Sequence, residues 1–193
     1  MAILVAFIFW ASGSLFMRMQ AWPDTNFWYE VSIIGMFLLP LLFYNFIAAF
    51  IGQKGYFLRI IYTICTAAII LAVHFHLFLK HPKVEILADG QPHFIYDITW
   101  PVIFPMVFSA FVVGSIFYMV IKDVRKNKMN FDRFLPILIG LVILFLGNLM
   151  DVFPFIGEFP GDTLSGIINA CFMVYALAKR RLFNLTLLIS RSS

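Results

Sequence analysis

Six runs of mostly apolar residues divide this 193-residue sequence, and each is close to the length of a membrane-spanning helix. The runs cover residues 1–17, 27–50, 56–79, 98–121, 134–153 and 163–178. A bilayer core is about 30 Å thick, and a helix of about 20 residues crosses it. The runs lack the alternation of apolar and polar residues that a membrane barrel needs. The sequence therefore predicts an all-α fold, a polytopic bundle of six transmembrane helices.

The composition excludes several other classes of protein. Hydrophobic residues make up 62% of the chain and charged residues 12%, whereas a soluble domain is about half apolar and about a quarter charged. A soluble enzyme, a disordered regulator and a disulfide-stapled secreted domain are therefore excluded. The two cysteines, Cys65 and Cys171, lie inside apolar runs and show no metal-site or redox spacing.

The basic residues are distributed unevenly between the two sides of the predicted bundle. Six spans make five loops on alternating sides, and only Arg18, Lys80 and Lys83 fall on one of these sides. The other side carries Lys54, Arg59, Lys122, Arg125, Lys126, Lys128, Arg133, Lys179, Arg180, Arg181 and Arg191. Because basic residues accumulate on the cytoplasmic side, we expect both termini in the cytoplasm of a bacterial inner-membrane protein. This segregation is not a nucleic-acid-binding patch, so no nucleic-acid partner is expected.

The longest loop, residues 81–97, connects the third and fourth spans on the outer side. Two short β-prone runs, Val84–Leu87 and Phe94–Tyr96, flank an Asp89-Gly90 pair. Asp-Gly between such runs is a hairpin signal. We therefore expect a small extracellular hairpin over the bundle.

The span centres hold no Asp, Glu, Lys or Arg, which counts against a pump or an ion-coupled transporter. Weaker polar groups gather in the outer half of the spans. The candidate ligand-binding residues are Glu30, His76, Asn148, Asp151 and Asn169. No metal and no cofactor are expected, because His76 and Asp151 lack a third ligand.

Stripes of small residues predict which helix faces turn inward, because small residues mark close helix packing in lipid. There are three such stripes. The first contains Cys65, Ala68, Ala72 and His76, the second contains Gly140, Leu144, Asn148 and Asp151, and the third contains Gly166, Asn169 and Met173. His74 lies about 200° around the helix from His76 and is expected to point elsewhere. Two interpretations fit the inward polar groups. They form a cup that opens to the outside and binds a small ligand, or they make ordinary interhelical hydrogen bonds of about 0.6 kcal/mol each.

The last span runs directly into a basic segment that we expect to transmit a signal. No Gly or Pro occurs from residue 167 onward, so nothing in the sequence ends the helix there. The expected transmission residues are Lys179, Arg180, Arg181, Leu182 and Phe183. Residues 1–182 would form the sensory bundle, and 183–193 a cytoplasmic helical tail toward an output domain that is absent here. The alternative is a basic stop-transfer flank with an amphipathic tail lying on the membrane.

Several short motifs resemble the N-terminal seven-helix membrane region of bacterial sensor histidine kinases. Gly147-Asn148-Leu149, Phe153-Pro154-Phe155-Ile156-Gly157 and the run Tyr175–Phe183 resemble the end of that region. Phe9-Trp10-Ala11-Ser12-Gly13 resembles its second helix, and Leu39–Phe43 resembles its third. The resemblance implies that this chain lacks the first helix and the kinase core of the family. Lys179-Arg180-Arg181 departs from the family pattern, in which an aromatic residue often separates the basic ones.

The resemblance implies a non-catalytic sensory module of a bacterial signalling protein. Its expected partners are the lipid bilayer, an unknown small ligand on the outer side, and a kinase or cyclase output domain in cis or in trans. A homodimer is also expected, because histidine kinases work as dimers. Two other classes fit the sequence: a small transporter or channel subunit, and a structural subunit of a membrane complex.

Overall fold

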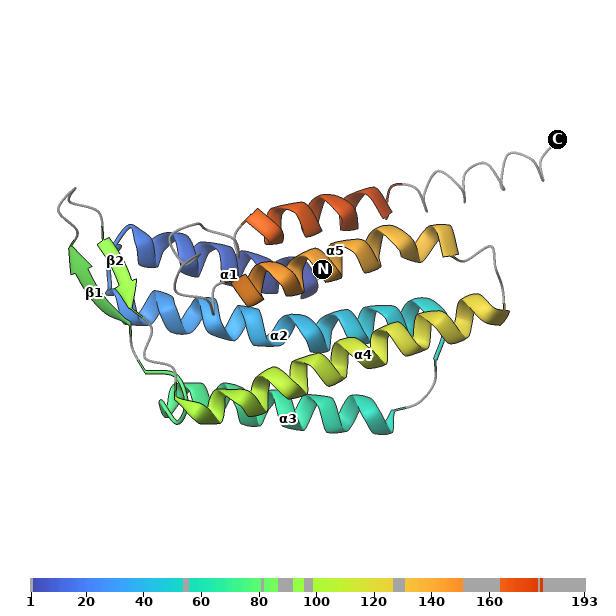
Figure 1. The fold of residues 1–193 in the computed structure, drawn as a ribbon, viewed down its shortest axis with the longest axis horizontal. Coiled ribbons are helices and arrows are strands. Elements are labelled where there is room, and N and C mark those ends of the chain that lie inside the picture. The colour runs from blue at the N-terminus through green and yellow to red at the C-terminus, as the bar shows by residue number, and fades with distance from the viewer. Residues whose placement is uncertain are drawn as a thin grey trace. The chain divides into compact units, whose positions relative to one another are not determined.

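The computed structural model describes residues 2–53, 56–80, 82–86, 92–95, 99–126, 131–150, 164–176 and 178. The chain divides into two compact units, Met1–Met119 and Val120–Ser193, which we describe separately (Figure 1). The elements in chain order are α1 (Ala2–Arg18), α2 (Thr25–Ile51), α3 (Phe57–His74), β1 (Lys83–Ile86), β2 (Pro92–Ile95), the 3₁₀ turn η1 (Trp100–Val102), α4 (Ile103–Lys126), α5 (Phe131–Met150) and a C-terminal helix, Leu164–Ala176.

The predicted helical membrane bundle is confirmed. Three helical segments are long and apolar enough to cross a membrane by length and composition, namely Thr25–Ile51, Phe57–His74 and Trp100–Arg125. Three shorter apolar helices accompany them in the described residues: Ala2–Arg18, Phe134–Gly147 and Leu164–Ala176. The count of six complete spans stays a prediction.

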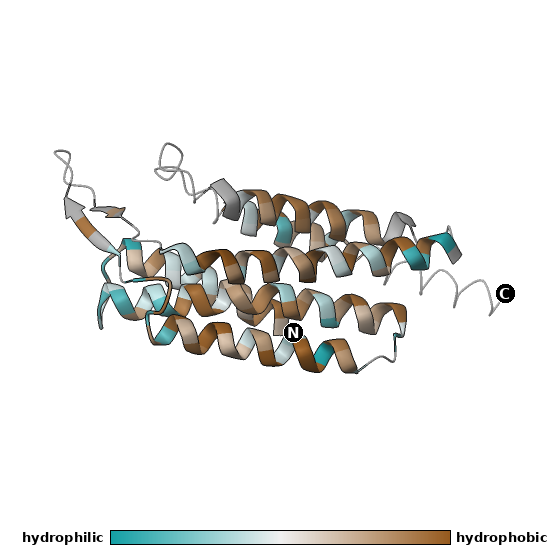
Figure 2. Ribbon diagram, turned by 60° about the horizontal axis from the view of Figure 1, so that its bottom comes forward, coloured by the Kyte–Doolittle hydropathy of each residue, from teal (hydrophilic) through white to brown (hydrophobic). Residues whose placement is uncertain are grey.

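The helices expose large apolar side chains that water would not tolerate. On α4, for example, Phe104, Val107 and Phe111 are all exposed. Hydrophobic residues dominate the lengths of the helices, and hydrophilic residues gather mainly at their ends (Figure 2). Contiguous exposed apolar surface of this extent requires a partner of the same character, and lipid is that partner for a spanning bundle.

Helices α1 and α2 pack closely because each presents a glycine to the backbone of the other. A Cβ on Gly13 would lie 2.5 Å from the backbone nitrogen of Ser32, and a Cβ on Gly35 would lie 2.5 Å from that of Trp10. The Ser32 hydroxyl donates a buried hydrogen bond of 3.1 Å to the carbonyl oxygen of Trp10. Small residues of this kind allow close van der Waals packing where lipid removes the hydrophobic driving force.

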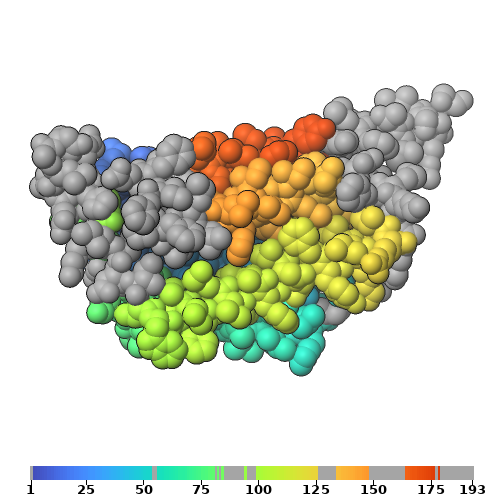
Figure 3. Space-filling view, viewed as in Figure 1, coloured from blue at the N-terminus to red at the C-terminus, as the bar shows by residue number. Residues whose placement is uncertain are grey.

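Tyr62 on α3 joins three helices in the core of the first unit. Its side chain is 2% exposed, and its ring meets the ring of Tyr44 on α2 edge-on, with centroids 4.8 Å apart. On α4 it contacts Phe108 and Phe111, and its hydroxyl lies 2.7 Å from Ser115 Oγ. Because Ser115 donates its own proton to the Phe111 carbonyl at 2.9 Å, Tyr62 is the donor in this pair. Helices α3 and α4 lie side by side as a result (Figure 3).

Helix α3 ends five residues earlier than the expected span 56–79. After His74 the chain turns, His76 has φ +54°, and Phe78 and Leu79 are buried. The Phe78 ring packs edge-on against Phe37 of α2 at 6.3 Å between centroids. Apolar residues therefore continue past the end of α3 because the chain returns to the core. Hydropathy alone does not distinguish a longer spanning helix from a helix followed by a buried turn.

The expected hairpin is present. Strands β1 and β2 pair antiparallel, with Val84 opposite Phe94 and Glu85 opposite His93. The predicted turn residues, 88–91, lie outside the described residues. The hairpin lies at the end of the first unit where α1 connects to α2 (Figure 1).

Replacing Gly13 with Ala should destabilise the α1–α2 pair, because the new methyl group collides with backbone that cannot rotate away. The expected loss is about 1–3 kcal/mol in the free energy of unfolding, measured by SDS titration in mixed micelles. Gly114→Ala is the matched control, since a Cβ there meets nothing within 4 Å. Equal stability of the two variants would contradict the close approach.

A double-mutant cycle with Tyr62→Phe and Ser115→Ala should give a coupling energy of about 0.6 kcal/mol, and at most about 1.7 kcal/mol. The same unfolding titration measures it. Tyr56→Phe should change stability by less than about 0.5 kcal/mol, because Tyr56 is exposed. A coupling energy of zero would mean that the two hydroxyls do not bond in the membrane.

Candidate functional site

Glu30 lies near the start of α2 and faces His74 at the end of α3. The distance from Glu30 Oε2 to His74 Nδ1 is 3.4 Å, and the side chains are 26% and 65% exposed, respectively. This is a long hydrogen bond, and it gains ionic character only when the histidine is protonated. The pair joins α2 to α3 at the end of the unit that carries Trp22 and the hairpin.

The expectation that His76 faces inward was wrong, whereas His74 is exposed, as expected. His76 follows the end of α3 and is exposed, so it does not continue an inward stripe, whereas His74 makes the contact with Glu30. The buried residues of α3 are Tyr62, Thr66 and Val73, and Ile69 and Ala72 pack against the same core. Of the other two residues in the expected stripe, Cys65 is half-buried and Ala68 is exposed. Large side chains fill most of the space beside α2 here, so small residues are a poor marker of the packed face of this helix. The ligand-binding role of His76 stays a prediction.

Asn169 is the most enclosed of the predicted site residues. Its side chain is 0% exposed, and neither Oδ1 nor Nδ2 has a hydrogen-bond partner among the residues that the structure describes. The amide packs directly on Gly140 of α5, where a Cβ would lie 2.5 Å from Oδ1. Burying an amide without a partner costs about 1–3 kcal/mol, so this group has a strong tendency to acquire a partner.

The inward stripes on the last two helices are confirmed where the structure describes them. On α5, Gly140 and Leu144 are buried, and on the C-terminal helix Gly166, Asn169 and Met173 are buried. The side chain of Asn148 is not described. Asp151 and the expected transmission residues 179–183 lie outside the described residues.

Sequence reasoning missed the hydroxyl groups on the inward face of α3. Tyr62 bonds to Ser115, and Thr66 is 2% exposed with no partner for Oγ1 among the described residues. Tyr62 lies in the half of α3 that begins at Phe57, and Thr66 lies at the middle of the helix, so the buried polar groups are not confined to the end of α3 that carries His74. Residues 62, 66, 69 and 73 are three or four positions apart, which is the spacing of residues on one helix face. This spacing could have identified the inward hydroxyl groups from the sequence.

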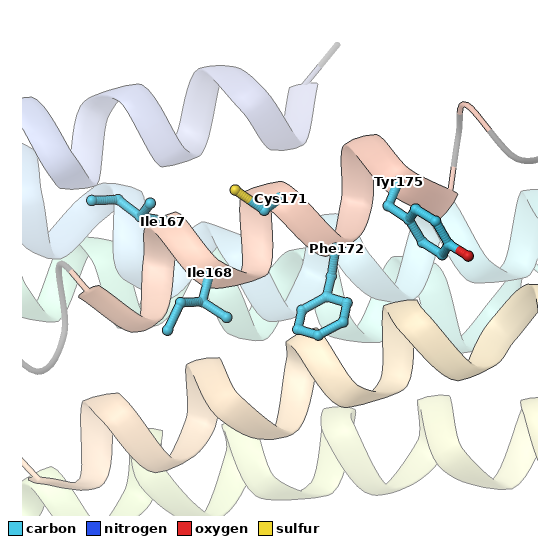
Figure 4. Close-up of a pocket in the computed structure, with 5 residues that line it drawn as sticks. All are labelled: Ile167, Ile168, Cys171, Phe172 and Tyr175. Carbon is cyan, nitrogen blue, oxygen red and sulfur yellow. The ribbon is translucent and has the colours of Figure 1, made fainter.

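A shallow apolar groove runs along the C-terminal helix. It measures about 410 Å³ and is lined by Ile167, Ile168, Cys171, Phe172 and Tyr175. Phe172 extends toward α5, and Cys171 points away from it (Figure 4). Within the described residues, no three His, Cys, Asp or Glu side chains come together in a way that could hold a metal ion.

Comparison with known proteins identifies the chain. A family model described as the N-terminal 7TM region of histidine kinase matches residues 1–186, nearly the whole chain. The match names histidine kinases and gives no support to the cyclase alternative. Curated proteins and solved structures gave no match. The helical architecture and the extent of the family match lead to one conclusion: this chain belongs to the family of N-terminal seven-helix membrane regions of histidine kinases.

Proposed function

We propose that this chain receives a stimulus in the outer half of the membrane and passes it through its last helix to a cytoplasmic kinase domain. The family match over residues 1–186 carries this proposal. The input region of a histidine kinase is not catalytic, so its output is a change of helix position or rotation. A homodimer is part of the proposal, because kinase domains act in pairs.

The proposed stimulus acts where the polar groups of the spans are concentrated. Glu30, His76, Asn148, Asp151 and Asn169 remain the proposed ligand-binding residues, and His74 joins them through its contact with Glu30. Trp22, Trp28 and Trp100 support a membrane-interface position for this end of the first unit. Its few basic residues, Arg18, Lys80 and Lys83, support it as the outer end, since basic residues accumulate on the cytoplasmic side.

Transmission is proposed to run through the C-terminal helix into Lys179–Phe183. The helix Leu164–Ala176 carries both the buried Asn169 and the apolar groove. Binding at Asn169 or in the groove would therefore act on the helix that leads to the proposed output domain. The excess of basic residues on the side of Lys179 supports a cytoplasmic position for both termini.

Cysteine labelling should establish the orientation. In a background where Cys65 and Cys171 are replaced by Ala, Lys80→Cys should react with a membrane-impermeant maleimide in spheroplasts. Arg125→Cys should react only after lysis, because its loop is expected to be cytoplasmic. Gel-shift detection of the labelled protein measures both. The reverse pattern would overturn the proposed direction of signalling.

Insertions at the end of the last helix should test transmission. Residues 1–193 are fused to a histidine kinase core, and one or seven alanines are inserted between Ala178 and Lys179. One residue rotates a continuous helix by about 100°, whereas seven residues leave it within about 20° of the original face.

Autophosphorylation in membrane vesicles is the readout of the insertion series. The one-residue insertion should change its rate by a factor within the roughly 5–150-fold range of allosteric coupling, and the seven-residue insertion should restore it. If both insertions leave the rate unchanged, helix rotation does not carry the signal.

A further inference from the structure

The second unit combines a buried amide that has no partner among the described residues with a shallow apolar groove along the same helix. We propose that it binds a membrane-dissolved amphiphile, whose hydrocarbon chain lies in the groove and whose uncharged polar head bonds to Asn169. This inference rests on the proposed sensory function and names the chemical class of its ligand: an amide, ketone or alcohol with a long apolar chain.

Asn169 supplies the polar half of the site. Its amide offers two N–H donors and one carbonyl acceptor, and none of these has a partner in the described residues. In a spanning helix, water is not at hand to complete the bonding. A ligand head with one acceptor or one donor would therefore gain a hydrogen bond that the protein itself leaves open.

The groove supplies the apolar half. Its volume of about 410 Å³ lies within the range of small-molecule pockets, roughly 300–1,000 Å³. Among the residues that the structure describes, the polar atoms of its lining belong to Cys171 and Tyr175, and no Asp, Glu, Lys, Arg or His lines it. A charged head would be costly in such surroundings, so the ligand is uncharged.

Phe172 connects the two halves. It lines the groove, and its Cβ lies 3.2 Å from the position that a Cβ on Gly140 would occupy. Asn169 Oδ1 lies 2.5 Å from that same position. Gly140 therefore closes the amide on the α5 side, and Asn169 is fully enclosed and does not itself line the groove. Because aromatic side chains on helices have two common χ1 rotamers, rotation of Phe172 would open a path between groove and amide.

Photolabelling of the full chain in detergent micelles tests the proposal without any kinase activity. The probe is dodecanamide carrying a diazirine near the end of its chain, and peptide mass spectrometry locates the cross-link. The expected cross-links fall on residues 167–175. Unlabelled dodecanamide should compete, and dodecane, which lacks the polar head, should compete at least about tenfold less well.

Three variants separate the polar and apolar contributions. Asn169→Leu should weaken competition by dodecanamide about tenfold and leave competition by dodecane unchanged. Asn45→Leu, the same substitution on α2, should change neither. Cys171→Trp fills the groove at an exposed position and should abolish the cross-link. Gel filtration confirms that each variant remains folded.

Two results would overturn the proposal. One is equal competition by dodecanamide and dodecane, which would make the groove an ordinary lipid-facing surface. The other is a cross-link outside residues 167–175 that Asn169→Leu does not affect. Binding without any effect on autophosphorylation of the kinase fusion would instead count against the proposed sensory function alone.

Discussion

Van der Waals contact is the interaction on which this structure depends most, because lipid removes the hydrophobic force that drives soluble helices together. The α1–α2 pair shows the consequence most directly. Gly13 and Gly35 place the two backbones in contact, and the Ser32 hydroxyl reaches the Trp10 carbonyl only because they are so close. Helices α3 and α4 are also held by contact, but through larger groups. The Tyr62 side chain fills the space next to α2 and α4, whereas glycines bring the backbones of α1 and α2 together directly.

The buried polar groups of the two units differ in how well they are satisfied. Tyr62 and Ser115 form a complete chain of donors and acceptors that ends on the Phe111 carbonyl. Asn169 makes no hydrogen bond with the described residues, although it is fully enclosed. A satisfied pair holds helices in one arrangement, whereas an open amide makes an alternative arrangement less unfavourable. In a sensor, an unsatisfied group such as the Asn169 amide is therefore the better candidate for the position at which the helices rearrange.

The sequence predicted the helices, the hairpin and the inward faces of the last two helices, because apolar run length and residue spacing reflect local physics. It misplaced the end of α3, since Phe78 and Leu79 are apolar for a tertiary reason: they pack against Phe37. The contact between His74 and Glu30 was missed because of the same turn. Once the chain turns after His74, helical geometry no longer applies to His76. The pairing of Tyr62 with Ser115 depends on how two helices meet across 53 positions, which no local pattern encodes.

The closure at the base of the hairpin has a consequence for how such proteins diversify. Thr99 donates two hydrogen bonds to the Phe78 carbonyl, from its backbone nitrogen at 3.2 Å and from its hydroxyl at 3.0 Å. Both ends of the intervening loop are thereby tied together above the core formed by Phe37, Val73 and Phe78. A loop closed at its base can be exchanged as a unit, so new specificities can arise by replacing residues 80–98 while Phe78, Leu79 and the helices beneath keep their packing.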